Sequence, residues 1–232
     1  MLKQLRVMLV PFDASIQIMK NSLIPSTTIK SRMEVLASLI KDKDVLDLGV
    51  VDYRERRRDD NQYFETHPTL LFRQISDINP GVTGVDIDQQ GIDNLKERDF
   101  NVICDNVETM DLGKTFDVIV AGEIIEHLEN PGLFLRNMLK HINPGGCFAI
   151  STPNPFYAKQ KHKIWRYNRP QVHEDHTCWF DPATLNELLH RCGWQTSENY
   201  WVQPSNQYVK TWPRLFRGYF SNSFLTIATK AP

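Results

Sequence analysis

The sequence predicts an α/β protein built on a mostly parallel sheet with helices on both faces. Short apolar runs of strand length, such as "DVLDLG" at 44–49 and "FDVIVAG" at 116–122, alternate with segments of helical periodicity. No internal repeat or low-complexity tract interrupts this alternation. A chain of 232 residues that is 41% hydrophobic can bury one sizeable core. We therefore expect one domain over residues 1–232.

Composition excludes several classes of function. The net charge is −1, so no overall field attracts the chain to nucleic acid or to an anionic membrane. No apolar run approaches the roughly 18 residues of a membrane span, and the start of the chain lacks a secretory signal. The four cysteines show no CxxC spacing, which favours reduced, mostly buried thiols. We expect a soluble, cytoplasmic protein without membrane insertion.

Strands are expected where apolar runs are bounded by turn residues or acids, at 44–49, 81–88, 101–105, 116–122, 147–152 and 223–230. A further strand is expected near 194–202. The helices are expected where apolar residues recur at helical spacing, at 31–40, 66–78, 89–98, 131–142 and 181–193. The first of these helices belongs to an N-terminal helical segment, 1–43.

Helix boundaries are marked by local chemistry. Thr66 is a plausible cap for the second helix. Asp181 caps the last helix, Pro182 takes its first turn and Gly193 ends it. The sequence "NPGG" at 143–146 stops the fourth helix and turns the chain into the following strand.

Two segments do not fit the alternation. Residues 50–65 are polar and highly charged, and we interpret them as an insertion between the first strand and its helix. Residues 153–180 have no clear period and are rich in aromatic, histidine and cationic side chains. A loop of that length in a compact domain is usually functional or disordered, and aromatic content argues against disorder. We interpret 153–180 as a substrate lid, although a plain surface loop with a few core anchors is an alternative.

Acidic residues and glycines close the central strands. Asp47 with Gly49, Asp86, Asp105, and Gly122 with Glu123 stand at carboxyl ends of predicted strands. Ligands of open α/β sheets bind at these ends, and a carboxylate there can accept hydrogen bonds from ribose hydroxyls. Each acid taken alone could equally be solvated or cap a helix. Taken together, they predict a nucleoside pocket.

The loop after the first strand indicates which type of nucleoside cofactor can bind. Dinucleotide folds carry G-x-G-x-x-G because the pyrophosphate needs closely approaching backbone amides. Here the loop reads Gly49-Val50-Val51-Asp52, and the acid would repel phosphates. A phosphate-free nucleoside with ammonium and sulfonium charges would be favoured by acids. The loop therefore excludes NAD better than it excludes S-adenosylmethionine.

These residues stand in motifs that resemble those of class I S-adenosylmethionine-dependent methyltransferases. The motifs are "VLDLG", "GVDID", "CDNVETMDL", "FDVIVAGEIIEHLENP" and "HINPGGCFAISTPNP", in the order of that family. The resemblance implies a Rossmann-like, seven-stranded sheet with an antiparallel last strand. It places Asp47 and Gly49 at the methionine moiety, Asp86 at the ribose, and Asp105 with Asn106 at the adenine. The departures are the glycine-poor loop and the 50–65 insertion. The expected cofactor-binding residues are Asp47, Gly49, Asp86, Ile87, Asp105, Asn106, Val107, Gly122 and Glu123.

A second motif concerns catalysis. If "EIIEHL" opens a helix, Glu123, Glu126 and His127 share one face, and "HEDH" adds His173 and His176 downstream. Carboxylates and imidazoles together suit Mg²⁺ or Mn²⁺. This motif resembles the ExxEH site of small-RNA 2′-O-methyltransferases and is also similar to ubiquinone-pathway O-methyltransferases. The alternative is that His127 packs, or acts as a base without metal. We expect catalytic residues His127, His173 and His176, and metal ligands Glu123, Glu126, His127 and His176.

The function predicted from these motifs is methyl transfer from S-adenosylmethionine to a hydroxyl of a sugar or glycan intermediate. Trp165, Arg166 and Tyr167 in the lid are residue types that stack on sugars. The partner is then a small-molecule or glycan acceptor, and a homodimer is compatible with the sequence. Three alternatives stay open: an RNA-end ribose 2′-O-methyltransferase, against which the near-zero net charge argues, a catalytically silent nucleoside-binding module, and an NAD-dependent oxidoreductase.

Overall fold

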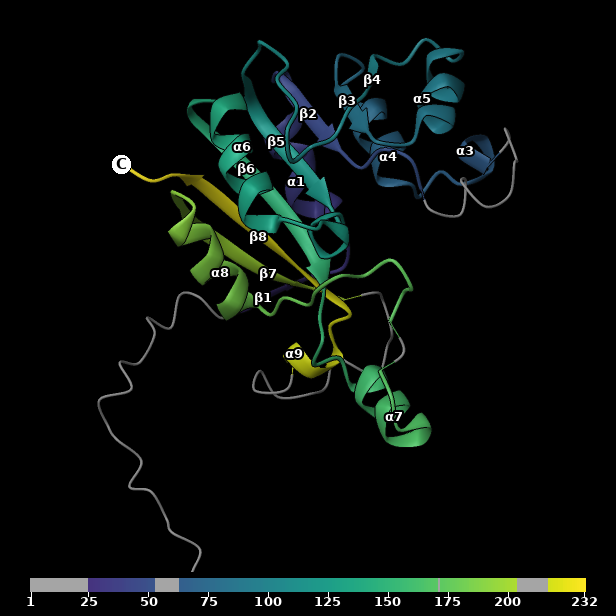
Figure 1. The fold of residues 1–232 in the computed structure, drawn as a ribbon, viewed down its shortest axis with the longest axis vertical. Coiled ribbons are helices and arrows are strands. Elements are labelled where there is room, and N and C mark those ends of the chain that lie inside the picture. The colour runs from purple at the N-terminus through teal and green to yellow at the C-terminus, as the bar shows by residue number, and fades with distance from the viewer. Residues whose placement is uncertain (1–24, 53–62, 171, 204–216) are drawn as a thin grey trace, which may run out of the picture.

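The computed structural model describes residues 25–52, 63–170, 172–203 and 217–232, which form a three-layer α/β unit (Figure 1). At its centre is an eight-stranded sheet in the order β1-β7-β8-β6-β5-β2-β3-β4. β8 runs antiparallel to both of its neighbours, and the other pairs are parallel. The strands are β1 Thr27–Ile29, β2 Val45–Leu48, β3 Thr83–Asp86, β4 Val102–Cys104, β5 Phe116–Gly122, β6 Ile142–Pro153, β7 Trp194–Val202 and β8 Ser223–Lys230.

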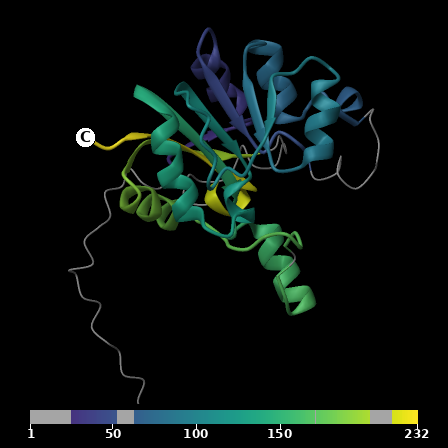
Figure 2. The ribbon, with the colours of Figure 1, turned by 45° about the horizontal axis from the view of Figure 1, so that its top comes forward.

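Helices cover the two faces of the sheet, as the turned view also shows (Figure 2). One core packs helices α1, α4 and α5 against the sheet, and a second core packs α6 and α8 against the opposite face. These helices are α1 Met33–Ile40, α4 Leu71–Ile78, α5 Gln89–Lys96, α6 Pro131–His141 and α8 Pro182–Arg191. Shorter or peripheral helices are α3 Tyr63–Thr66, the 3₁₀ helix η1 Ile125–His127, α7 Ala158–Tyr167 and α9 Arg217–Phe220.

The central strands are apolar because both of their faces are covered. Every residue of β2 is buried, and Leu36, Ile75 and Ile92 approach the sheet from one face while Phe134 and Leu185 approach it from the other. Burying each such side chain contributes about 1.5–3 kcal/mol. This packing fixes the strand ends, and with them every loop that leaves the carboxyl edge of the sheet.

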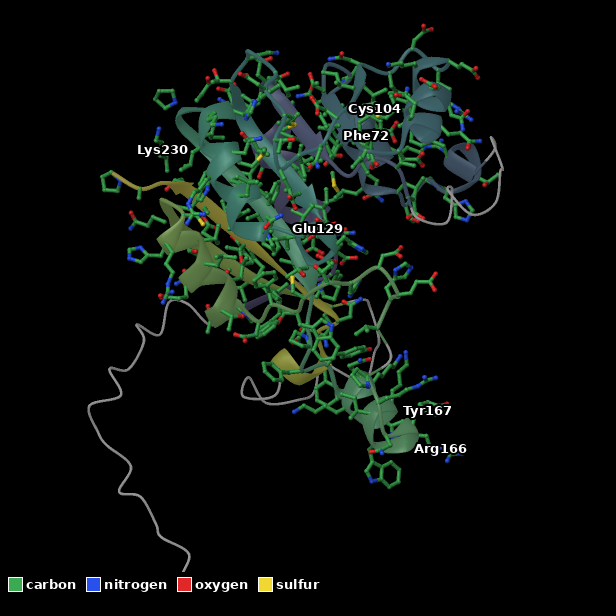
Figure 3. All side chains as sticks on the ribbon, in the orientation of Figure 1. Phe72, Cys104, Glu129, Arg166, Tyr167 and Lys230 are labelled. Atoms are coloured by element: carbon green, nitrogen blue, oxygen red, sulfur yellow. The ribbon has the colours of Figure 1, made fainter. Side chains whose placement is uncertain are left out.

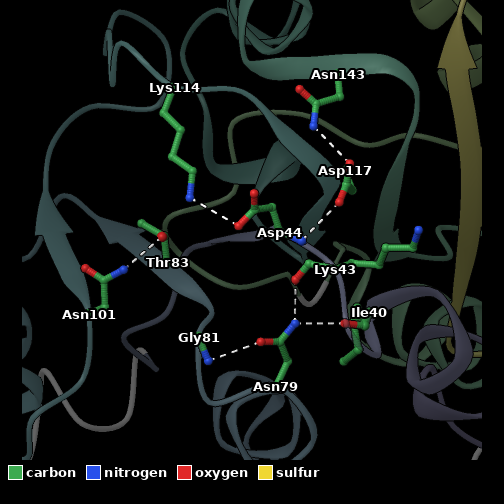
Figure 4. A network of polar contacts seen from close by, with 10 residues as sticks. All are labelled: Ile40, Lys43, Asp44, Asn79, Gly81, Thr83, Asn101, Lys114, Asp117 and Asn143. Atoms are coloured by element: carbon green, nitrogen blue, oxygen red, sulfur yellow. Dashed lines mark hydrogen bonds and ion pairs between the residues drawn. The ribbon is translucent and has the colours of Figure 1, made fainter.

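Polar contacts hold the opposite, amino edge of the sheet together (Figure 4). The side-chain amide of Asn79 donates to the carbonyls of Ile40 and Lys43, both at 2.8 Å, and its oxygen accepts from the Gly81 amide. Asp117 accepts from the Asp44 amide and from the Asn143 side chain, which lowers the pKa of its carboxyl. These contacts join the segments that enter strands β2, β3 and β5.

Several expectations from the sequence are confirmed. The sheet is mostly parallel with an antiparallel last strand, and β5, β7 and β8 coincide with the predicted ranges. Asp181 caps α8 in a reciprocal capping box with Thr184, and Gly193 follows the helix in the left-handed conformation. The four cysteines are free, but only Cys192 is buried and the other three are half-buried.

Other expectations are wrong. Within the described ranges the sheet has eight strands, not seven, because Thr27–Ile29 pairs in parallel with β7 where only helix was expected. Thr66 ends the short helix α3, and α4 begins at Leu71 after Leu70. Most of the 50–65 insertion, residues 53–62, lies outside the described residues, as do residues 1–24 of the N-terminal segment. Among the described residues, none of the helices has the length and apolar character that crossing a bilayer requires.

Candidate functional site

The end of strand β2 turns at Gly49. This residue has φ +76°, a conformation that glycine adopts without the steric cost paid by other residues. Its amide donates to the carbonyl of Val85 at 2.8 Å, which ties the β2 loop to the neighbouring strand β3. A side chain at this position would meet Ile124, in the segment after β5, at 3.2 Å. Gly49 therefore lets the loops after β2 and β5 approach each other.

Val50 and Val51 point away from the strand ends. Both are buried in the core beneath α1, α4 and α5. A Cβ placed on Gly91 of α5 would lie 2.4 Å from a Val51 methyl, and one placed on Gly84 would lie 3.0 Å from a Val50 methyl. The side chains of Val50 and Val51 thus occupy the space that is left because Gly84 and Gly91 have no side chain. They do not fill the edge where a nucleoside would bind.

Asp86, the last residue of β3, is buried and held by backbone amides. One carboxylate oxygen accepts from the Val51 amide at 2.9 Å and the other from the Asp88 amide at 2.9 Å. A carboxylate oriented in this way fits the two adjacent hydroxyls of a ribose.

The next strand end carries the residues expected at the adenine. The Asp105 amide donates to the Asp86 carbonyl at 3.0 Å, so the two strand ends are adjacent. The Asp105 carboxylate accepts from the Asn106 amide, and the Asn106 side chain accepts from the Glu108 amide. Ile87 is exposed, whereas Val107 is buried in the core. The structure therefore brings Asp86, Asp105 and Asn106 together and directs the Val107 side chain elsewhere.

Asp47 lies inside β2 and is only 2% exposed. Burial raises the pKa of its carboxyl from 3.8 to about 8, and the nearby Asp86 charge adds to this effect. The Leu48 amide and the guanidinium of Arg32 act in the opposite direction. The carboxyl is thus poised to lose its proton when a further positive charge arrives beside it.

Arg32 is a site residue that the sequence did not reveal. Its guanidinium donates to the Ser151 hydroxyl at 3.0 Å and lies 3.6 Å from a Glu123 carboxylate oxygen. Its charge also lowers the pKa of Asp47 and of Glu126. Arg32 is one of 27 basic residues and immediately precedes α1, so no sequence signal marked it. It places one cation among the acids at the carboxyl edge.

The segment after β5 does not form the expected helix. Glu123 has φ +58°, and only Ile125–His127 make a short 3₁₀ turn, η1. The chain bends here because the Glu123 amide donates to the Ser151 carbonyl and Leu71 packs against Gly122, where a Cβ would lie 2.1 Å from a Leu71 methyl. Glu123, Glu126 and His127 therefore do not share a helix face.

Glu126 points into the protein. It is 1% exposed and accepts from the Thr152 hydroxyl at 3.0 Å. Burial, with a smaller contribution from the Glu123 charge, raises the pKa of its carboxyl to about 8. Neither Glu123, which pairs with Arg32, nor Glu126 belongs to the group of potential metal ligands that converges among the described residues.

The converging group consists of His127, His173 and His176, whose ligand atoms all lie within 4.8 Å of one another. The rings of His127 and His176 are perpendicular with centroids 4.6 Å apart, and the His173 ring lies within 6 Å of both. Burial and the two neighbouring imidazoles lower the pKa of His176 to about 4. The structure therefore joins the three histidines named as catalytic, from segments 46 residues apart.

The two halves of the lid lie differently. Helix α7 has no buried residue and projects away from the sheet, with Arg166 and Tyr167 at its far end (Figure 3). Trp165 is 80% exposed. The later half returns to η1, where Thr177 donates from its amide to the Glu126 carbonyl at 2.9 Å and from its hydroxyl to the Leu128 carbonyl at 2.6 Å.

Comparison with known proteins finds a matching family model and many solved structures with a similar fold. The family model described as "Methyltransferase domain" matches residues 27–199. A S-adenosylmethionine-dependent methyltransferase from Archaeoglobus fulgidus superposes with a TM-score of 0.59 at 16% identity, covering 87% of this chain and 92% of that one. One from Mesorhizobium loti gives 0.53 at 15% identity, covering 82% and 92%. At these identities the likeness shows the fold.

Curated relatives are named ubiquinone biosynthesis O-methyltransferase. The protein from Rickettsia conorii is 38% identical over 79 residues, which are 32% of this chain and 27% of the relative. The protein from Rickettsia akari is 35% identical over 124 residues, which are 47% of each chain. The matches thus span less than half of these relatives.

Proposed function

Because this chain belongs to the methyltransferase-domain family, we propose that it transfers a methyl group from S-adenosylmethionine to a hydroxyl of an acceptor. The observation that carries the proposal is the set of carboxylates at adjacent strand ends. Asp86 closes β3 and is held by two backbone amides, at the strand end where an acidic residue of an open α/β sheet binds a ribose diol. Asp105 and Asn106 lie beside it for the adenine.

The charges beside the ribose position suit an amino-acid tail. Asp47 and Glu123 can face an ammonium group, while the Arg32 guanidinium can pair with a carboxylate. The pyrophosphate of NAD would meet Asp47, Asp86 and Asp52 without glycine amides to hold it. S-adenosylmethionine is therefore the better cofactor for this edge.

The acceptor hydroxyl must lose its proton as the methyl group moves. We assign this step to the metal-free cluster of His127, which follows β5, with His173 and His176 from the lid beside it, and His127 is the base. The low pKa of His176 keeps that ring neutral at physiological pH, so it can accept a hydrogen bond or a proton. Direct displacement then requires only that the hydroxyl and the methyl group be aligned.

Two acceptor classes follow from different observations. A sugar or glycan hydroxyl is favoured by the exposed aromatic and cationic side chains of the lid, including Trp165, Tyr167 and Lys161. A hydroxyl of a ubiquinone precursor is favoured by the names of the curated relatives. A net charge of −1 gives no support to an RNA acceptor.

The test is formation of S-adenosylhomocysteine from S-adenosylmethionine with three acceptor panels: nucleotide-activated sugars and oligosaccharides, catechols, and short RNA. We expect turnover with one of the first two panels. Asp86→Asn should raise the KM for S-adenosylmethionine by about tenfold or more, since hydrogen bonds to a charged group contribute about 1.5–3 kcal/mol. The matched control is Asp93→Asn, at an exposed position of α5. Cofactor binding without turnover on any panel would instead indicate a silent module.

A further inference from the structure

Three imidazoles converge from two separate segments of the chain. His127 ends η1, directly after strand β5, and His173 and His176 lie in the returning half of the lid. Each offers a ring nitrogen, and these atoms lie within 4.8 Å of one another. All three are partly exposed, so an ion can reach them from solvent. A tetrahedral ion with bonds of about 2.0–2.1 Å holds its ligand nitrogens about 3.3 Å apart, which needs only small side-chain rotations here.

We propose that His127, His173 and His176 bind one divalent transition-metal ion of the zinc, cobalt or nickel type. Neutral imidazole is a preferred ligand of these ions, whereas Mg²⁺ and Mn²⁺ prefer carboxylate and water oxygens. The two glutamates expected as ligands are engaged elsewhere, Glu123 with Arg32 and Glu126 with Thr152. The proposed site therefore differs from the sequence-based expectation in two ways. Its ligands are three histidines in place of a mixture of glutamates and histidines, and its metal is of the zinc type in place of Mg²⁺ or Mn²⁺.

Asp175 lies beside the His173 ring. Its carboxylate oxygen is 3.6 Å from the His173 Nδ1 atom, which is beyond hydrogen-bond distance, and its backbone amide donates to that atom at 3.4 Å. Binding of an ion through Nε2 requires the ring proton to lie on Nδ1, where the Asp175 carboxylate is the neighbouring acceptor. Three protein ligands also leave one coordination position open, as is common in catalytic zinc sites.

The ion would staple the lid to the body of the protein. Thr177 and Cys178 already donate their backbone amides to the Glu126 carbonyl, at 2.9 and 3.4 Å, beside the cluster. Any local opening that separates 173–178 from η1 also separates the three histidines. Metal binding therefore opposes that opening by mass action. This inference does not require the proposed methyl transfer, because metal binding and lid opening are measured without substrate. While an ion is bound, the His127 ring has no nitrogen left to accept a proton, so His127 can act as the base only in the metal-free protein.

The first test is metal binding by the full chain after chelator treatment, followed by calorimetry with Zn²⁺ and by the absorption spectrum with Co²⁺. We expect one equivalent of either ion and none of Mg²⁺. His173→Gln and His176→Gln should each weaken binding by more than about 100-fold, the effect that losing even a supporting partner of a ligand can reach. The matched control is His190→Gln, on an exposed position of α8, which should bind as the unaltered chain does.

The second test is hydrogen exchange of the Thr177 amide. At a free Zn²⁺ concentration 100 times its Kd, exchange should slow by about 100-fold, while the Leu185 amide in α8 stays unchanged. Far-ultraviolet circular dichroism of each variant shows whether it is folded. The proposal is overturned if Zn²⁺ binds no better than Mg²⁺, or if the histidine variants bind Zn²⁺ as tightly as the control variant does. It is also overturned if the exchange rate of the Thr177 amide is the same with and without Zn²⁺.

Discussion

Arg32 is in electrostatic contact with three carboxyl groups, those of Asp47, Glu123 and Glu126. Its side chain remains about one-quarter exposed, so it can turn toward a ligand without leaving the acids. A guanidinium at this edge is the natural partner for the carboxylate of an amino-acid tail. The residue shows how a site is completed by a segment far away in the sequence.

Arg32→Met should weaken binding of S-adenosylmethionine by about tenfold or more, because a charge-assisted hydrogen bond contributes about 1.5–3 kcal/mol. Arg32→Lys should restore part of the loss, since the charge remains but the fork of donors does not. Calorimetric titration measures both, with Arg191→Met, at an exposed position at the end of α8, as control. Equal affinities for all three variants would remove Arg32 from the site.

Asp47 links the site to pH. Its carboxyl is neutral in the folded protein up to a pKa of about 8 but ionises in the unfolded chain near its ordinary value of 3.8. Between these values the folded state holds one more proton, so stability falls as pH rises. Glu126, with a pKa also raised to about 8, acts in the same direction.

Asp47→Asn should therefore flatten the pH dependence of stability between about pH 5 and 8, removing a slope of up to about 1.4 kcal/mol per pH unit. Urea unfolding at a series of pH values measures this slope. Asp93→Asn, which alters an exposed carboxylate, should leave it intact. A slope retained in full by Asp47→Asn would show that this carboxyl is already ionised in the folded protein.

Helix α5 and the β2 loop fit together at the scale of elements. Gly91 lets α5 pack directly on Val51, whose methyl would lie 2.4 Å from any added Cβ, while the Val51 amide holds Asp86. In a dinucleotide-binding loop, glycines allow the backbone to approach the ligand closely. Here the glycine that allows a close approach is Gly91, in the helix that packs on the loop. The side chains of Val50 and Val51 are buried in the core, while the Val51 amide faces Asp86 at the site.

Gly91→Ala should destabilise the fold by about 1–3 kcal/mol, the cost of an overpacked core contact, and should weaken cofactor binding by displacing the Val51 amide. Adding Val51→Ala to the same chain should recover part of both losses, because it removes the clashing methyls. Urea unfolding and calorimetry on the single and double variants test the coupling. Strictly additive losses would mean that the two residues do not press on each other.

Sequence predicted the elements that carry strong local signals and missed those that depend on neighbours. The apolar runs of β5 and β8 and the capped helix α8 were readable because each is specified within its own segment. Strand β1 was missed because three residues, Thr27–Ile29, show no period of their own and are held by β7. Helix α7 was missed because its exposed surface shows no apolar face to the core.

The same distinction applies to the site. The gathering of Asp47, Gly49, Asp86 and Asp105 at one edge of the sheet could be predicted, because strand ends of a parallel sheet meet there, and their contacts with a cofactor stay a prediction. The convergence of His127 with His173 and His176 depends on where the lid returns, which only the tertiary structure gives. The left-handed turn at Glu123 likewise depends on its amide bond to the Ser151 carbonyl.

On the scale of the whole molecule, the carboxyl edge of the sheet holds the candidate site and the amino edge holds a structural polar network. The carboxyl edge collects Asp47, Asp86, Arg32 and the histidines, whereas the amino edge is a polar network centred on Asn79 and Asp117 (Figure 4). The sheet keeps the two apart. Changes at the amino edge should therefore alter stability and leave the site intact.

Asn79→Ala should lower the free energy of unfolding by about 1–3 kcal/mol, because it leaves the carbonyls of Ile40 and Lys43 and the Gly81 amide without their partner. Urea unfolding measures the loss. The affinity for S-adenosylhomocysteine, measured below the unfolding transition, should stay within twofold of the unaltered chain. A parallel loss of affinity would show that the two edges are coupled.

The central claim is that the acids at the carboxyl edge bind a phosphate-free adenosine derivative. Calorimetric titration of the full chain with S-adenosylhomocysteine, and separately with NADH, tests it most directly. The structure predicts one equivalent of S-adenosylhomocysteine, affinity reduced about tenfold or more in Asp86→Asn, and no binding of NADH. Binding of NADH in place of S-adenosylhomocysteine, or S-adenosylhomocysteine affinity unchanged by Asp86→Asn, would contradict it.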